Sequence, residues 1–177
     1  MTDVARFEGF VREYQDMVFA TAVRLLGRES DAEDVAQTAF MRAFERFDQV
    51  VDSPAAAGWL KTVTTNLCLN HLSRHRSRWR LFSEMDPVRE MPRLEERIAL
   101  LASAPEQMER AEEQDRLERA LRRLPDQQRV PLVLFHFEEM SYQAIAEALR
   151  VSLSKVKTDI HRGREALKQE LKVHGSR

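Results

Sequence analysis

The sequence is poor in cysteine and glycine, and each shortage excludes a class of protein. One cysteine, Cys68, among 177 residues rules out a disulfide framework and most cysteine-built metal sites. Only five glycines occur and none lies between Gly58 and Gly163, so glycine-rich phosphate loops and dinucleotide fingerprints are absent. No apolar run approaches the roughly 20 residues that span a bilayer, and the polar N-terminus does not resemble a signal peptide. We therefore expect a folded cytoplasmic protein.

The formal net charge is only −1, but the charges are unevenly distributed. Residues 1–83 carry 11 basic and 11 acidic side chains, residues 84–118 carry 5 and 11, and residues 119–177 carry 12 and 7. The three segments therefore have net charges of 0, −6 and +5. Separation of charge along a chain in this way indicates a polyanionic partner more strongly than the total does.

Apolar residues recur at helical spacing in both halves of the chain, which predicts an all-α fold. In the first half, Gly27 is placed to end one helix as a C-terminal glycine. Ser30 and Glu33 predict a capping box that opens a second helix through about residue 47. Residues 48–57 contain a proline and are expected to form a loop before a third helix over about 58–76. These elements make one three-helix unit, which we place within residues 1–80.

The third predicted helix has an apolar and a polar face. We expect Leu60, Val63, Leu67 and His71 to face the core, and Thr62, Thr65, Asn66, Asn70 and Ser73 to face outward. Arg74, Arg76 and Arg78 follow, and Trp79 comes directly after them. Amides, hydroxyls, arginines and an aromatic ring suit a single strand or a flipped base. A polar outer face with a basic end explains the same composition about as well.

Residues 81–112 are acidic and contain three prolines, which is typical of a linker. Helical patterning resumes at about residue 113, and residues 113–177 form the second predicted domain. Asp126, Ser141 and Ser152 are each placed to cap a helix. A three-residue joint, 150–152, connects a short helix to a long basic one, which predicts a helix-turn-helix.

Polar side chains on the second helix of that motif are the candidates for contact with DNA, since base edges in the major groove are read by hydrogen bonds. The predicted outward positions are Ser154, Lys155, Lys157, Thr158, His161 and Arg162. Asp159 lies beside this face and would repel phosphate. A basic helix on an ordinary bundle is the alternative interpretation, but the short turn and preceding short helix favour DNA binding.

Metal binding and catalysis find little support in the sequence. Cys68, His71 and His75 fall on one helix face, but no fourth ligand is evident and His71 also lies on the apolar stripe. No nucleophile, base and orienting group occur at a recognisable spacing. We therefore expect no catalytic residue, no metal and no cofactor.

Two blocks of sequence resemble the bacterial RNA polymerase sigma factors of the sigma-70 family. Residues 31–37 (DAEDVAQ), Trp59-Leu60 and residues 66–72 (NLCLNHL) look like the family's region 2. Residues 124–129 (LPDQQR), 141–146 (SYQAIA) and 151–162 resemble its region 4. With only these two regions and a short linker, the chain is similar to the extracytoplasmic-function (ECF) group. The pair of blocks in this order is far more specific than either alone.

The resemblance implies a role for each matching residue. Asp34 and Gln37 match positions that dock on the clamp of the polymerase core, and residues 48–58, which include Asp52 and Ser53, match the loop that captures a flipped base of the minus-ten element. Asn66 and Asn70 lie on the adjoining face, and Arg74, Arg76 and Arg78 would follow the nearby DNA backbone. Lys157, Thr158, His161 and Arg162 match positions that read the minus-thirty-five element. The linker would enter the channel that holds nascent RNA, and an anti-sigma protein is the expected inhibitor.

Three residues depart from the family pattern. Thr38 stands where the family usually has Glu, and Glu139 and Arg150 stand where Gly commonly ends a helix. A non-glycine residue at those two helix ends must adopt a left-handed conformation or form a different turn.

The residues alone also leave two other functions open. One is a dimeric repressor or activator that never contacts polymerase, for which no heptad seam is visible. The other is a metal-sensing regulator built on Cys68, His71 and His75.

Overall fold

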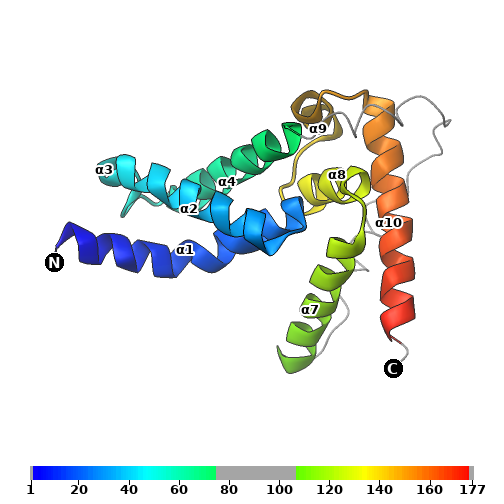
Figure 1. Ribbon diagram of the computed structural model, residues 1–177, viewed down its shortest axis with the longest axis horizontal. Helices are drawn as coiled ribbons and strands as arrows, with labels where there is room; N and C mark the ends of the chain where they lie inside the picture. Colours follow the sequence, from blue (N-terminus) through cyan, green and yellow to red (C-terminus); the bar gives the residue numbers. More distant parts are fainter. Residues whose placement is uncertain (1, 75–106, 176–177) are drawn as a thin grey trace. The chain divides into compact units, whose positions relative to one another are not determined.

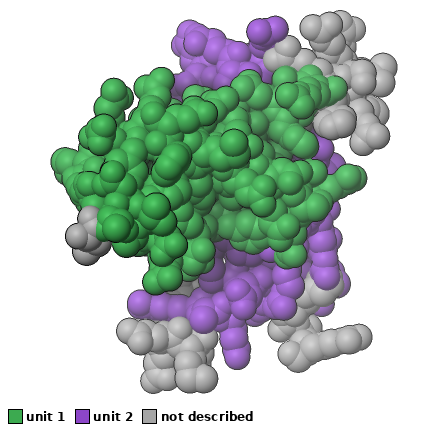
Figure 2. All heavy atoms as spheres, turned by 60° about the vertical axis from the view of Figure 1, so that its left-hand side comes forward, with its two compact units in different colours: residues 1–78 green, residues 79–177 purple. Residues whose placement is uncertain are grey.

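The computed structural model describes residues 2–74 and 107–175, and within these ranges all regular structure is helical (Figure 1). The chain divides into two compact units, residues 1–78 and residues 79–177, which Figure 2 colours separately. The predicted all-α fold is therefore confirmed for the described residues. Arg76, Arg78, His75, Trp79 and most of the predicted linker lie outside them.

The first unit is built from α1 (Asp3–Leu26), α2 (Glu29–Glu45), the one-turn α3 (Phe47–Val50) and α4 (Ala56–Ser73). The three long helices pack against one another. The core where they meet is made by Phe10, Val18, Ala39, Ala43, Val50, Val51, Ala56 and Leu60. Small residues on α2 let the helix approach α1 closely, and aromatic rings of α1 and α2 fill one end of the core, as Phe10 and Phe40 do with ring centroids 6.4 Å apart.

Local sequence explains the end of α1 but not the start of α2. Gly27 ends α1 in the left-handed region, with φ 73°, and its N–H donates to the carbonyl of Val23, as predicted. The predicted capping box at Ser30 is wrong, because α2 already begins at Glu29 and Arg28 is its N-cap residue. The side chain of Arg28 makes no capping hydrogen bond to the helix. The acidic side chains Glu29 and Asp31 instead lie in the first turn, where they favour the positive end of the helix dipole.

Two other predictions for this unit need correction. Residues 48–57 are not wholly a loop, because α3 extends to Val50 and α4 starts at Ala56. Thr65 does not face outward: it is buried, as are Thr64 and Cys68. The Thr64 hydroxyl donates to the Leu60 carbonyl one turn earlier, which satisfies that polar group inside the core.

The second unit consists of α7 (Gln107–Arg123), α8 (Asp126–His136), α9 (Tyr142–Leu149) and α10 (Leu153–Gly175). The long α10 packs against each of the other three helices. Helix α7 begins six residues before the predicted start at residue 113, and so lies partly in the segment predicted as linker. Asp126 is the first residue of α8 rather than its cap, and Pro125 occupies the N-cap position. Pro131 lies inside α8.

Candidate nucleic-acid interface

The helix-turn-helix of the second unit is formed by α9, a short turn and α10. The Ser141 hydroxyl accepts a hydrogen bond from the Ala144 N–H at 3.1 Å and so caps α9. The Ser152 hydroxyl accepts one from the Lys155 N–H, also at 3.1 Å, at the start of α10. Both predicted caps are confirmed, and each satisfies an N–H that the helix itself leaves unpaired.

The turn between the two helices is closed by a residue in a left-handed conformation. Arg150 has φ 53° and ψ 49°, and its N–H donates to the Glu147 carbonyl at 3.3 Å. The Val151 N–H donates to the Ala146 carbonyl at 3.0 Å. This pair of bonds is the Schellman arrangement, which usually carries glycine at the position of Arg150. Glu139, after α8, is likewise left-handed, with φ 54°. Arg150 and Glu139 therefore both adopt the left-handed conformation rather than forming a different turn, which was the other predicted outcome.

The inner face of α10 is a continuous stripe that contains charged side chains as well as apolar ones. Val156 and Ile160 are fully buried, and Lys155 and Asp159 each expose only 6% of their surface. The Lys155 ammonium and the Asp159 carboxylate are 2.6 Å apart. Burial raises the pKa of Asp159, while its hydrogen bond to Lys155 and the charge of that ammonium act in the opposite direction.

One predicted site residue is wrong. Lys155 does not face outward, because its side chain is inside the unit and paired with Asp159. Asp159 was expected to repel DNA phosphates from a position beside the reading face. Its carboxylate is instead buried and paired, so it presents no exposed charge. The other five predicted positions, Ser154, Lys157, Thr158, His161 and Arg162, are exposed or half-buried on the side of α10 away from this stripe.

Further along α10, contacts with α8 fix the direction of the helix. A Cβ atom on Gly163 would lie 3.0 Å from the Gln128 carbonyl oxygen, which is tighter than an ordinary contact, so glycine favours this close approach. Arg164 is buried, and its Nε donates to the Nε2 atom of His136 at 3.1 Å. Arg129 is also buried and donates to the Leu124 carbonyl at 2.9 Å and to the Asp126 carboxylate at 2.6 Å. Arg129 and Arg164 therefore make contacts inside the unit, whereas Lys157 is half-buried and Arg162 is exposed.

In the first unit, the predicted site residues lie on two helices and the loop between them. Asn66 and Asn70 are exposed on α4, and Arg74 is exposed at its end, so the three share one face at a spacing of four residues. Asp52 and Ser53 lie in the loop before α4. Asn66 follows the first residue of α4 by ten positions, or about 15 Å along the helix axis. Asn66, Asn70 and Arg74 therefore lie at increasing distances along α4 from the loop.

A groove of about 880 Å³ lies between α1 and α2 beside Gln37. Phe7, Phe19, Phe40 and Met41 contribute apolar surface to it, and Glu33 and Glu45 add negative charge. Met41 and Phe44 are 65% and 55% exposed, which is unusual for large apolar side chains.

The two predicted core-binding residues, Asp34 and Gln37, are both exposed on α2. Sequence reasoning missed the groove, although phenylalanine and methionine at spacings of three to four residues could have revealed it.

The candidate metal triad is described only in part, because His75 lies outside the described residues. Cys68 is buried in the core, and the His71 Nε2 atom lies 3.6 Å from the Asp31 carboxylate of α2. No group of three His, Cys, Asp or Glu side chains suited to a metal ion occurs among residues 2–74 and 107–175. Within the same ranges, no helix is long and apolar enough to cross a membrane.

Two helical units, one of which presents a helix-turn-helix with a basic outer face, define a DNA-binding protein of the transcription machinery. Comparison with known families agrees: residues 10–78 match the model for sigma-70 region 2, and residues 114–167 match the model for sigma-70 region 4. Together the two matches cover most of the chain. The protein therefore belongs to the sigma-70 family of RNA polymerase sigma factors, within the ECF group, and directs RNA polymerase to promoters to initiate transcription.

Similar proteins extend over nearly the whole sequence. The ECF RNA polymerase sigma factor SigW of Bacillus subtilis is 29% identical over 170 residues, which is 96% of this chain and 91% of that protein. The RNA polymerase sigma-E factor of Streptomyces avermitilis is 31% identical, with 96% and 87% covered. Among solved structures, the sigma factor RpoE of Bartonella quintana in complex with the anti-sigma factor NepR has a TM-score of 0.49 at 22% identity, with 94% and 97% of the two chains covered.

Proposed function

We propose that the two units divide promoter recognition between them, with the second unit reading the minus-thirty-five element. Ser154, Lys157, Thr158, His161 and Arg162 would carry this contact. The observation that supports it most directly is the sorting of charge on α10, where Lys155, Asp159 and Arg164 are buried and the remaining polar residues face outward. Lysine suits phosphate, and Thr158, His161 and Arg162 can reach base edges.

The first unit, within predicted residues 1–80, would hold the polymerase core and the melted minus-ten strand. Asp34 and Gln37 lie on α2 beside the groove, whose exposed Met41 and Phe44 offer apolar area to the clamp. Asp52 and Ser53 would face the extruded base, and Asn66 and Asn70 would bond the strand beside it. Arg74 would contact its backbone, and Arg76 and Arg78 extend this assignment outside the described residues. The predicted 81–112 linker would follow the path of nascent RNA.

Promoter opening by this protein would need no catalytic chemistry of its own. Extruding a base costs a few kcal/mol of stacking and pairing, and trapping that base offsets the cost. We place the protein in the cytoplasm, where it would meet polymerase and chromosome. An anti-sigma protein that covers one or both units is its expected regulator.

Separate assays on the holoenzyme test which unit contacts each promoter element and the core. R162A should weaken binding of upstream promoter DNA without changing the affinity for core, and D34A should weaken core binding. N66A should impair promoter opening more than core binding. K168A is the matched control on α10, because it removes the same charge from a half-buried position beyond the proposed reading face. Equal losses from R162A and K168A would contradict the assignment of the upstream contact.

A further inference from the structure

The loop between α3 and α4 contains a strained residue. Asp52 has φ 69°, in the left-handed region that residues other than glycine rarely adopt. The neighbouring Val51 and Ala56 are buried, so both ends of the loop are anchored while Asp52 itself is exposed. A conformation of this kind persists only where its surroundings hold it.

Hydrogen bonds within the loop hold both the turn from Val50 to Ser53, which contains Asp52, and the part of the loop that follows it. The Ser53 N–H donates to the Val50 carbonyl at 3.1 Å, and the Ser53 hydroxyl accepts from the Ala55 N–H at 3.2 Å. The Ala56 N–H donates to the Ser53 carbonyl at 3.1 Å. None of these three bonds uses the carboxylate of Asp52.

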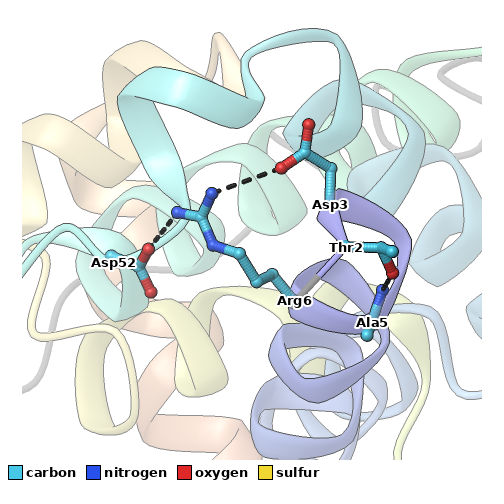
Figure 3. Close-up of polar contacts among 5 residues, drawn as sticks. All are labelled: Thr2, Asp3, Ala5, Arg6 and Asp52. Atoms are coloured by element: carbon cyan, nitrogen blue, oxygen red, sulfur yellow. Dashed lines mark hydrogen bonds and ion pairs between the residues drawn. The ribbon is translucent and has the colours of Figure 1, made fainter.

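That carboxylate is held from another helix, 46 positions away in sequence. The Nη2 atom of Arg6 on α1 forms an ion pair and hydrogen bond with the Oδ2 atom of Asp52, as Figure 3 shows. The Nη1 atom of the same guanidinium lies 3.4 Å from a carboxylate oxygen of Asp3. Its Cζ atom is 5.0 Å from the centre of the Phe47 ring on α3. Arg6 therefore links the first turns of α1, α3 and the loop.

We propose that Arg6 is a positioning residue for the loop that captures the minus-ten base. It holds the Asp52 carboxylate and so ties the turn from Val50 to Ser53 to α1. The loop is then already ordered when it meets the unstacked base, and less freedom is lost on binding. It also neutralises a carboxylate that would otherwise lie bare beside DNA phosphates. This inference rests on the proposed function of the loop.

The position of the contact separates this role from a structural one. The Arg6 and Asp52 side chains are 37% and 70% exposed, and ion pairs at such sites contribute little to global stability. Loss of Arg6 should therefore affect the loop far more than the fold.

The test uses holoenzyme assembled from core and the full chain, with a pool of single-stranded DNA randomised over the minus-ten segment. Wild-type holoenzyme should select a preferred sequence. R6A should bind the selected oligonucleotide about two- to fivefold more weakly at unchanged core affinity, consistent with an exposed pair. R6K should recover part of the loss, because lysine restores the charge but not the planar group over Phe47. R12A, at another exposed arginine of α1, should have no effect.

A second substitution distinguishes neutralisation from direct contact with DNA. In the R6A background, D52N removes the bare carboxylate and keeps a side chain that tolerates the left-handed region, so it should restore most of the lost affinity. Additive losses in the double variant, or a salt slope lowered by about one, would show that Arg6 contacts phosphate itself and would overturn the proposal. If the wild-type holoenzyme selects no sequence, the proposed function of the loop fails and this inference fails with it. An R6A variant identical to wild type, with selection intact, overturns the inference alone.

Discussion

The buried Lys155–Asp159 pair makes a specific prediction about the stability of the helix-turn-helix. Replacing Lys155 with methionine keeps much of the side-chain volume but removes the cation 2.6 Å from the Asp159 carboxylate. Asp159 exposes only 6% of its surface, so its carboxylate would be left buried without its ionic partner. Breaking a buried pair on one side costs about 3–5 kcal/mol, because the remaining charge is no longer compensated.

Protonation sets a ceiling on that cost. Without Lys155, the Asp159 carboxylate can be protonated and so become neutral. At pH 7, protonating a carboxylate with an ordinary pKa of 3.8 costs about 4 kcal/mol. At pH 5 the same ceiling is about 1.6 kcal/mol. The K155M variant should therefore lose about 3–4 kcal/mol at pH 7, and the loss should shrink as the pH falls. The double variant K155M/D159L removes both charges and should be close to the wild type in stability.

Hydrogen exchange followed by mass spectrometry is the suitable assay, since peptides from residues 126–167 report on the second unit separately from the first. Faster exchange in K155M, reversed in K155M/D159L and weaker at pH 5 than at pH 7 after correction for intrinsic exchange rates, is the expected result. Unchanged exchange in K155M would refute the reasoning. So would a normal fold combined with a lower salt slope for DNA binding, because Lys155 would then contact phosphate rather than Asp159.

Three further predictions concern α10 and the turn before it. K157A should weaken upstream DNA binding and lower its salt slope by about one, and an unchanged slope would show that Lys157 contacts no phosphate; R162A should weaken binding of the preferred upstream sequence more than binding of unrelated DNA, and equal losses would show that Arg162 reads no base edge. G163A should destabilise the second unit by about 1–3 kcal/mol, measured by the same exchange experiment, because its Cβ would lie 3.0 Å from the Gln128 carbonyl oxygen; unchanged or increased stability would show that this carbonyl shifts to accept the methyl group. R150G should stabilise the second unit by about 0.5–1 kcal/mol, since glycine adopts φ 53° without strain, and a loss of stability would show that the arginine side chain is itself required.

Features set by local sequence were predictable. Gly27, Ser141 and Ser152 end or begin helices as expected, because capping depends on a few neighbouring residues. The strained backbone at Glu139 and Arg150 was one of two foreseen outcomes for the same reason. The helical periodicity of both halves gave the fold class and the helix-turn-helix.

Features set by tertiary contacts were not predictable in the same way. Lys155 looks like an outward residue because lysine is rarely buried, and only its spacing of four from Asp159 hints at a pair. Thr65 is buried although its neighbours made it look like part of a polar face. The Arg6–Asp52 contact joins residues 46 positions apart and leaves no local signal. In each case packing between helices, rather than propensity within one, decides the position of the side chain.

Transcription in vitro with purified core polymerase tests the central claim most directly. Genomic DNA and core from the source organism, with and without this protein, are transcribed and the RNA 5′ ends are mapped. We expect a set of start sites that appears only with the protein and shares two upstream elements, and R162A should reduce these transcripts while K168A leaves them unchanged. Identical start sites with and without the protein would contradict its assignment as a promoter-specific sigma factor.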